Sequence, residues 1–138
     1  MILMRHGDCF PDYENDPGLS LAGYARIRHS SSSLLRYSLT VILHSDKRRT
    51  IETVHTLRAV LPKVASESHP ALREIHPLAL QDAQHEDALR AAAAFERFVR
   101  PHLGKPVLVV AHRNILQFFC RQLGLANCFE EFGEYIIV

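Results

Sequence analysis

The sequence predicts an α/β fold of three layers, in which a mostly parallel sheet has helices on both faces. Short apolar segments typical of strands alternate with longer segments typical of helices along the whole chain. The most apolar of them, residues 107–111, contains no polar side chain, as expected for a parallel strand buried on both faces. This alternation favours one layered sheet covered by helices. The 138 residues fit a single domain, residues 1–138.

The first expected strand and helix lie on either side of a polar loop. Residues 2–4 are apolar and end abruptly at a polar segment, which is typical of a buried strand that opens into a loop. Residues 10–18 contain two prolines and a glycine, so we expect them to form this loop. Ser20 then predicts a helix N-cap, with the helix over residues 21–35. We interpret the four serines of residues 30–33 as the solvated face of this helix.

The middle of the chain predicts a second strand and helix, followed by less regular structure. Residues 39–43 are apolar and partly β-branched, as strands are. A helix is expected over residues 47–61, and Pro62 ends it. We expect a short third strand at residues 64–65 and irregular structure over residues 66–82.

The last third of the chain predicts two helices on either side of the apolar strand, and a final strand. The first helix is rich in alanine, begins at Asp82 or Gln84 and ends at residue 99. A second helix is expected over residues 114–123, and residues 135–138 have the composition of a last strand.

The composition is that of an ordinary globular protein and excludes several function classes. Apolar residues make up 47% of the chain and charged residues 22%, which argues against disorder. The net charge of +1 provides no general attraction to nucleic acids or anionic membranes, so we expect neither as a partner. No apolar run reaches the length of a membrane span. The odd cysteine count, three, without a CxxC pair favours the cytoplasm or another reducing compartment.

Polar side chains follow three of the predicted strands at the point where each strand ends. These are Arg5 and His6, then residues 45–49, then residues 112–114. In sheets of this class, ligands bind beyond the carboxyl ends of the strands. We therefore expect these three segments to converge on one crevice.

The residue types in this crevice suit phosphoryl transfer. Arginine offers a planar fork of donors that matches phosphate oxygens, so Arg5 and Arg49 are candidate phosphate ligands. His6 can act as a nucleophile when it is neutral, and nearby guanidinium groups disfavour its protonated form. His112 can donate to a phosphoryl oxygen. Glu74 is the candidate acid that protonates the leaving oxygen.

These stretches resemble the histidine phosphatase superfamily, also called phosphoglycerate-mutase-like. That family has an apolar strand ending in Arg-His-Gly, a Leu-Thr-x-x-Gly turn, a Ser-x-x-x-Arg-x-x-Gln-Thr motif, an acid after Leu-Arg, and a histidine after a Val-rich strand. Matches occur here in the same order and run almost from end to end of the chain: Arg5-His6-Gly7, residues 19–23, Ser45 with Arg49, Glu52 and Thr53, then Glu74, then His112.

The resemblance implies a function and the residues that perform it. It implies a minimal phosphoglycerate-mutase-like fold and a metal-independent phosphatase without a cofactor. Such an enzyme hydrolyses a phosphomonoester through a phosphohistidine intermediate, here on His6, with Glu74 as the proton donor. Arg5, Arg49 and His112 are then the residues that bind the phosphoryl group, and His112 also takes part in catalysis.

The match is most similar to the mitochondrial protein serine/threonine phosphatase branch. There the middle motif reads Ser-x-x-x-Arg-x-Ile-Glu-Thr, as residues 45–53 do here, and a His-x-Asn pattern with a later Cys-Arg matches residues 112–121. This branch implies a phosphoprotein or a small phosphomonoester as the substrate. Arg113 departs from the family pattern, which usually has Gly or Ala there. The larger side chain either narrows the site or adds a third cation.

Two other functions stay open at this point. Arg113 and the short loops also fit a catalytically weak module that binds phosphorylated partners, although such a module does not need a nucleophilic His6. The compact chain also fits a protein phosphohistidine phosphatase. Two residue assignments also have alternatives. Glu67 or Asp82 could be the proton donor instead of Glu74, and Arg48 could bind the phosphate instead of Arg49.

Overall fold

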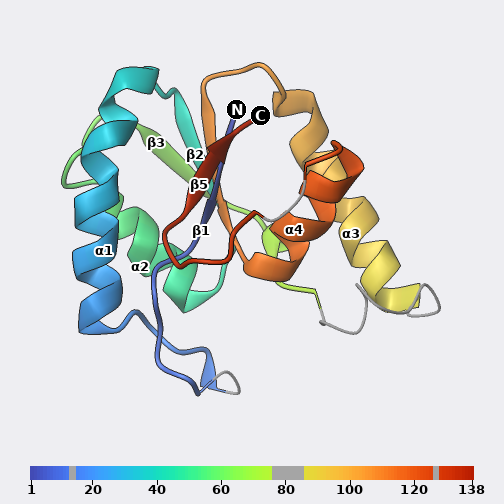
Figure 1. The fold of residues 1–138 in the computed structure, drawn as a ribbon, viewed down its shortest axis with the longest axis horizontal. Helices are drawn as coiled ribbons and strands as arrows, with labels where there is room; N and C mark the ends of the chain where they lie inside the picture. Colours follow the sequence, from blue (N-terminus) through green and yellow to red (C-terminus); the bar gives the residue numbers. More distant parts are fainter. Residues whose placement is uncertain (13–14, 76–85, 126–127) are drawn as a thin grey trace.

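The structure of the protein, a computed structural model, describes residues 1–12, 15–75, 86–125 and 128–138. Within these residues five strands form one sheet in the order β3-β2-β4-β1-β5 (Figure 1). Their bounds are β1 Ile2–Arg5, β2 Val41–His44, β3 Ala65–Ser68, β4 Val107–Ala111 and β5 Tyr135–Ile137. Strands β1, β2, β3 and β4 run parallel to one another, and β5 runs antiparallel to β1 at one edge. The predicted mostly parallel sheet is therefore confirmed.

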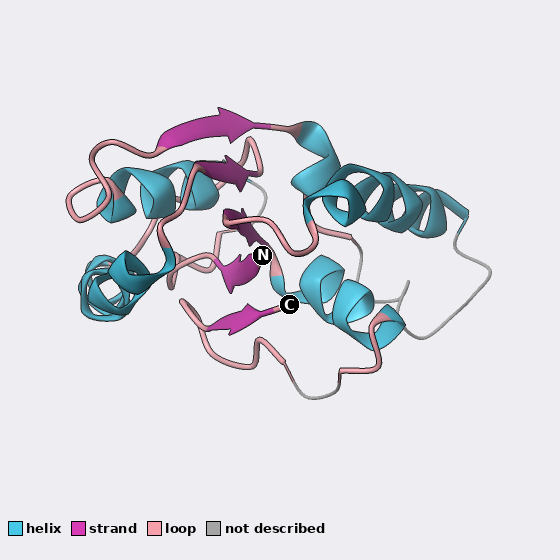
Figure 2. Ribbon diagram, turned by 90° about the horizontal axis from the view of Figure 1, so that it is seen from above, coloured by secondary structure: helices cyan, strands magenta, loops and turns pink. Residues whose placement is uncertain are grey.

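Helices cover both faces of this sheet, which confirms the three predicted layers. The helices are α1 Leu21–Ser31, α2 Arg48–Leu57, α3 Glu86–Val99 and α4 Arg113–Gln122. Helices α1 and α2 lie on one face, and α3 and α4 lie on the other (Figures 1 and 2). A hydrophobic core lies on each face of the sheet, and successive side chains of β4 point into one core and then the other. Leu108 and Val110 pack in the core beneath α1 and α2, whereas Val107 and Val109 pack in the core beneath α3 and α4.

Helix α1 ends earlier than the apolar pattern predicts, and its serines explain why. The α-helix stops at Ser31 and continues as a 3-10 helix over Ser32–Tyr37. All four serine hydroxyls at positions 30–33 donate to main-chain carbonyls three or four residues earlier. Such bonds compete with regular α-helical pairing. Our interpretation of this run as a solvated face is wrong at Ser31, which is fully buried.

The other boundaries shift by a few residues. Strand β2 begins at Val41 rather than at residue 39, and β3 occupies Ala65–Ser68, which includes residues expected to be irregular. Helix α2 starts one residue late and ends at Leu57 instead of residue 61. The predicted start of the helix at Asp82 or Gln84 lies outside the described residues, within which α3 begins at Glu86.

The start of α1 is packed directly against the loop that follows β1. Ser20 is the predicted N-cap: its hydroxyl accepts the N–H of Gly23 at 3.0 Å and donates to the Asp8 carboxylate at 2.9 Å. A Cβ atom on Gly23 would lie only 2.1 Å from the carbonyl oxygen of Asp8. Glycine therefore allows the helix to approach the backbone that carries His6. None of the helices in the described ranges is long and apolar enough to cross a membrane.

Candidate active site

The strand order brings the three predicted polar segments to one edge of the sheet. Strands β2, β4 and β1 are neighbours, so the residues after their carboxyl ends lie side by side. The backbone N–H of His6 donates to the carbonyl of Ala111 at 3.0 Å, and that of Ser45 donates to Val110 at 3.2 Å. The ring centroids of His6 and His112 are 5.1 Å apart. The predicted convergence of these segments is thus present in the structure.

The contacts of His6 assign its two ring nitrogens different roles. Nδ1 lies 2.7 Å from the carbonyl oxygen of Gly7, an acceptor, so Nδ1 carries the proton. Nε2 lies 3.3 Å from Nε of Arg49, a donor, so Nε2 carries the lone pair. The Gly7 backbone is itself held by the hydroxyl of Thr53 at 3.0 Å. The nitrogen able to attack an electrophile is therefore Nε2.

His6 is held in its neutral form by its surroundings. Its side chain is buried. Burial lowers the pKa of His6 to about 3, and the guanidinium charges of Arg49 and Arg5 act in the same direction. His112 is also buried, and burial followed by the nearby charges lowers its pKa well below the usual value. Both imidazoles are therefore uncharged near neutral pH.

These lowered pKa values predict that acid destabilises the protein. The unfolded chain binds a proton at His6 as the pH falls through about 6.5, whereas the folded chain resists protonation down to about pH 3. Between pH 7 and pH 5, His6 alone should lower the free energy of unfolding by about 2 kcal/mol. His112 adds to this loss. Urea unfolding in phosphate-free buffer at the two pH values measures it.

The variant His6→Gln isolates this contribution. Its free energy of unfolding should depend less on pH than that of the wild type over the same interval, by about 2 kcal/mol. Glu74, whose pKa is raised, acts in the opposite sense, and the comparison between the two proteins removes its effect. Equal pH dependence in the two proteins would contradict the assignment of a buried neutral His6.

The sequence resemblance assigns Arg49 rather than its neighbour Arg48 to the phosphate, and the two side chains differ in their surroundings in the structure. The Arg49 side chain is 9% exposed and reaches His6, while that of Arg48 is 67% exposed and pairs with Glu52 at 2.7 Å. Glu52 also accepts the backbone N–H of Leu19 at 2.6 Å and the hydroxyl of Tyr24 at 3.0 Å. Glu52 and Arg48 thus connect α2 with α1 and with the loop after β1, whereas Arg49 is the one of these two arginines that contacts His6.

Arg5 is oriented by the C-terminal segment. Its Nη1 donates to the carbonyls of Phe129 at 3.1 Å and Glu130 at 2.7 Å. The guanidinium also lies over the ring of Phe132, 3.8 Å from its centroid, and that ring is 5.6 Å from the ring of His6. Phe132 is a site residue that the sequence reasoning missed, since nothing in the local pattern connects it with residues at the other end of the chain.

Two further predicted residues are held by specific contacts. His112 is fully buried, with its Nε2 3.0 Å from the hydroxyl of Ser45. The carboxylate of Glu74 accepts the backbone N–H groups of Ile75 at 3.0 Å, Asn114 at 3.3 Å and Ile115 at 3.1 Å. Glu74 therefore caps the N-terminus of α4, directly after His112.

The electrostatics of Glu74 suit a proton donor despite this cap. Burial raises the pKa of Glu74, and the three N–H groups and the charge of Arg49 only partly oppose the effect. The neighbouring Arg73 forms an ion pair with Asp46 in the loop after β2. Of the alternative acids, Glu67 is exposed on the edge strand β3, and Asp82 lies outside the described residues.

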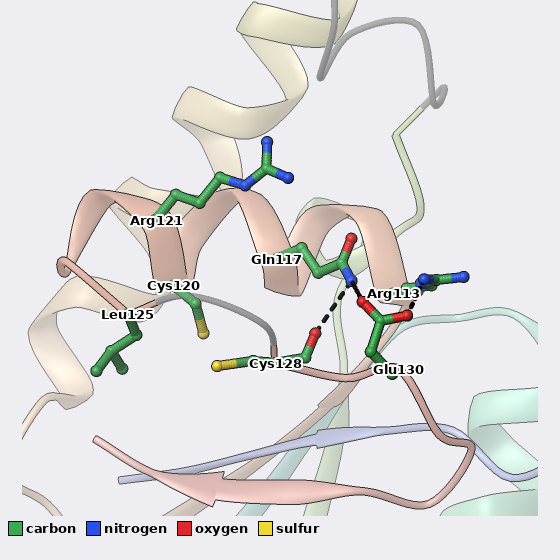
Figure 3. Close-up of a pocket in the computed structure, with 7 residues that line it drawn as sticks. All are labelled: Arg113, Gln117, Cys120, Arg121, Leu125, Cys128 and Glu130. Atoms are coloured by element: carbon green, nitrogen blue, oxygen red, sulfur yellow. Dashed lines mark hydrogen bonds and ion pairs between the residues drawn. The ribbon is translucent and has the colours of Figure 1, made fainter.

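In the contacts of the described residues, Arg113 pairs with Glu130 and does not reach His6. Its guanidinium forms an ion pair with Glu130, which also accepts from Gln117 at 3.1 Å (Figure 3). These side chains line a cavity of about 210 Å³ along α4. Its lining also includes Cys120, Arg121, Leu125 and Cys128. This cavity includes none of the predicted catalytic or phosphate-binding residues.

Comparisons with known proteins give the family and the fold of this chain. The family model of the histidine phosphatase superfamily (branch 1) matches residues 1–91. A search of curated proteins finds no match. Among solved structures, a mycobacterial glucosyl-3-phosphoglycerate phosphatase in complex with VO3 superposes with a TM-score of 0.72 at 19% identity, over 98% of this chain and 88% of that one.

Two other solved structures are similar in the same way. YhfR of Bacillus stearothermophilus has a TM-score of 0.70 at 21% identity, over 90% of this chain and 79% of its own. A phosphoglycerate mutase from Plasmodium falciparum has a TM-score of 0.66 at 20% identity, over 91% of this chain and 75% of that one. At such identities these similarities establish the phosphoglycerate-mutase-like fold. The family match, which covers more than half of the chain, shows that the chain belongs to the histidine phosphatase superfamily.

Proposed function

We propose that this chain, as a single domain, is a metal-independent phosphatase that hydrolyses a phosphomonoester through a phosphohistidine on Nε2 of His6. One observation carries the proposal: Nδ1 of His6 is engaged by its own backbone, and Nε2 faces the guanidinium of Arg49. A neutral imidazole in this orientation is a nucleophile with a phosphate-binding group beside it.

The first half of the reaction forms the phosphoenzyme. Nε2 of His6 attacks phosphorus as the bond from phosphorus to the ester oxygen breaks. Arg5, Arg49 and His112 hold the phosphoryl oxygens and stabilise the charge of the transition state. Glu74, whose raised pKa favours the protonated carboxyl group, gives its proton to the leaving oxygen, and the alcohol departs.

The second half regenerates the enzyme. Glu74, now a carboxylate, accepts a proton from water as the water oxygen attacks phosphorus. The bond between phosphorus and Nε2 breaks, inorganic phosphate leaves, and His6 and Glu74 return to their starting protonation states. The same guanidinium groups stabilise both transition states, so the positive charge of the site comes from its own side chains.

We further propose a phosphoprotein or a small phosphomonoester as the substrate, as in the mitochondrial protein serine/threonine phosphatase branch. The support is in the sequence: the Ile-Glu-Thr ending at Thr53, and the Cys-Arg pair at positions 120–121. In the structure, Glu52 of this motif connects α2 with α1 and with the loop that follows His6. Substrate contacts beyond the phosphoryl group come from loops, which vary on a common scaffold.

Hydrolysis of p-nitrophenyl phosphate in the presence of EDTA tests the proposal. We expect turnover that EDTA leaves unchanged. Binding of phosphate without any turnover would contradict the enzyme and favour the module that only binds phosphorylated partners. Comparing hydrolysis of a phosphoserine peptide with that of a phosphohistidine protein then tests the substrate class. A strong preference for the phosphohistidine protein would contradict the proposed phosphomonoester substrate and favour a protein phosphohistidine phosphatase.

Replacing each of the two adjacent arginines by alanine tests which of them binds the phosphoryl group. Removing a donor that stabilises the transition state typically lowers the rate roughly a hundred- to a thousandfold. We expect at least this loss in kcat/KM for Arg49→Ala, and a mild loss for the matched control Arg48→Ala, whose side chain is mostly exposed. The reverse ranking would show that the wrong arginine is assigned to the phosphate.

A further inference from the structure

Asp16 brings a carboxylate of the protein itself to the guanidinium of Arg49. Its Oδ1 lies 3.5 Å from Nη1 of Arg49. Both of its oxygens also lie 3.2 Å from the backbone nitrogen of Arg48, the first residue of α2, whose N–H they accept. Because Arg49 in turn contacts Nε2 of His6, the carboxylate is separated from the nucleophile by one guanidinium.

The backbone around Asp16 is shaped to hold this position. Asp16 has φ of +50°, a left-handed conformation that Asp tolerates better than most non-glycine residues. Two residues later the backbone is held in place, because the carbonyl oxygen of Gly18 accepts the N–H of Phe10 at 3.3 Å. A Cβ atom on Gly18 would lie 2.6 Å from the carboxylate of Glu52. The loop is therefore packed on α2, with the Asp16 side chain 39% exposed at the rim of the site.

We propose that Asp16 is an intramolecular competitor of the substrate for the phosphate-binding donors. In the free protein its carboxylate neutralises Arg49 and caps α2. A phosphoryl group that binds Arg49 brings up to two negative charges to within a few ångströms of the carboxylate, so Asp16 must leave. Asp16 thereby sets the affinity of the site for phosphorylated substrate and speeds the release of inorganic phosphate. This inference rests on the proposed function, which places the phosphoryl group at Arg49.

Titration of the protein with inorganic phosphate by calorimetry tests the competition without requiring turnover. The variants are Asp16→Asn, which keeps the shape of the side chain, and Asp16→Gly, which keeps the positive φ and adds no donor. Both should bind phosphate about three- to tenfold more tightly than the wild type. The matched control is Asp12→Asn, an exposed residue of the same loop that pairs with Asn15 and should leave the affinity unchanged.

Thermal denaturation provides a second readout. Asp16→Gly loses the cap on α2, and Asp16→Asn keeps only one of the two accepting oxygens. Both should therefore melt at lower temperature without phosphate, and Asp16→Gly should show the larger decrease. Saturating phosphate should then raise their melting temperatures more than that of the wild type, because tighter binding to the folded state gives a larger shift. A role for Asp16 that is only structural would lower the melting temperature without enlarging the shift.

Unchanged or weaker phosphate binding in both Asp16 variants would overturn the inference. So would tighter binding in Asp16→Asn alone, since the new amide donor would then be the cause. The variant Arg49→Ala separates this failure from that of the proposed function. If Arg49→Ala leaves phosphate affinity intact, the phosphate site itself is misplaced. If Arg49→Ala weakens binding but the Asp16 variants do not strengthen it, only the competition is wrong.

Discussion

His6→Ala should lower turnover of p-nitrophenyl phosphate by roughly ten-thousandfold or more. Loss of a covalent nucleophile removes the reaction path itself, and such losses reach about a millionfold in well-studied hydrolases. The structure gives a specific reason to expect this here. The Nε2 atom carries the lone pair of a neutral imidazole, and the guanidinium of Arg49 lies 3.3 Å from it.

A matched control separates chemistry from folding. His55 lies on the exposed side of α2, the helix that carries Arg49, so His55→Ala should leave turnover nearly unchanged. Urea unfolding of both variants shows whether they are folded under assay conditions. Turnover by folded His6→Ala within about tenfold of the wild type would exclude His6 as the nucleophile.

Glu74→Gln should slow the hydrolysis of an alkyl phosphate or a phosphoserine peptide by about a hundred- to ten-thousandfold. An alkoxide leaves poorly unless it is protonated, whereas p-nitrophenolate leaves well without help. The variant should therefore still phosphorylate His6 with p-nitrophenyl phosphate, but lose the base that activates water. Pre-steady-state assays should show a burst of nitrophenol followed by a slow steady rate.

Because Glu74 also caps α4, a loss of activity through proton transfer must be separated from a loss of stability. A glutamine still has one carbonyl oxygen to accept the N–H groups of α4, so Glu74→Gln keeps part of the cap. Glu74→Ala removes it entirely and should cost about 1 kcal/mol of stability. A residue that only caps a helix would slow both classes of substrate to the same mild degree. Equal, mild effects of Glu74→Gln would remove Glu74 from the mechanism.

The fold and the approximate position of the site could be predicted because their signals are local. The continuous apolar run of β4 identifies a doubly buried strand, and the change from apolar to polar after Met4 marks where β1 meets the site. The parallel order of the strands then brings the polar segments together. The roles of His6, Arg49, Arg5, His112 and Glu74 in the reaction stay predictions, which the variants above test.

The remaining features depend on contacts between distant segments. Nothing near Phe132 in the sequence indicates that its ring lies against Arg5 and His6, because the return of the chain along the antiparallel β5 creates that contact. The same holds for Asp16, whose loop is folded back onto α2. The early end of α1 is different, since serine hydroxyls compete locally with the helix, and a pattern of apolar spacing does not register them.

Rapid-quench labelling with a phosphorus-32 substrate tests the central claim most directly. The account predicts a burst of label on the wild-type protein that is labile in acid and stable in alkali, as expected for a phosphoramidate. Peptide mapping should place the label on His6, and His6→Ala should carry none. Acid-stable label on a serine, or turnover of the wild type without any labelled protein in a time course that resolves the burst, would contradict a phosphohistidine mechanism.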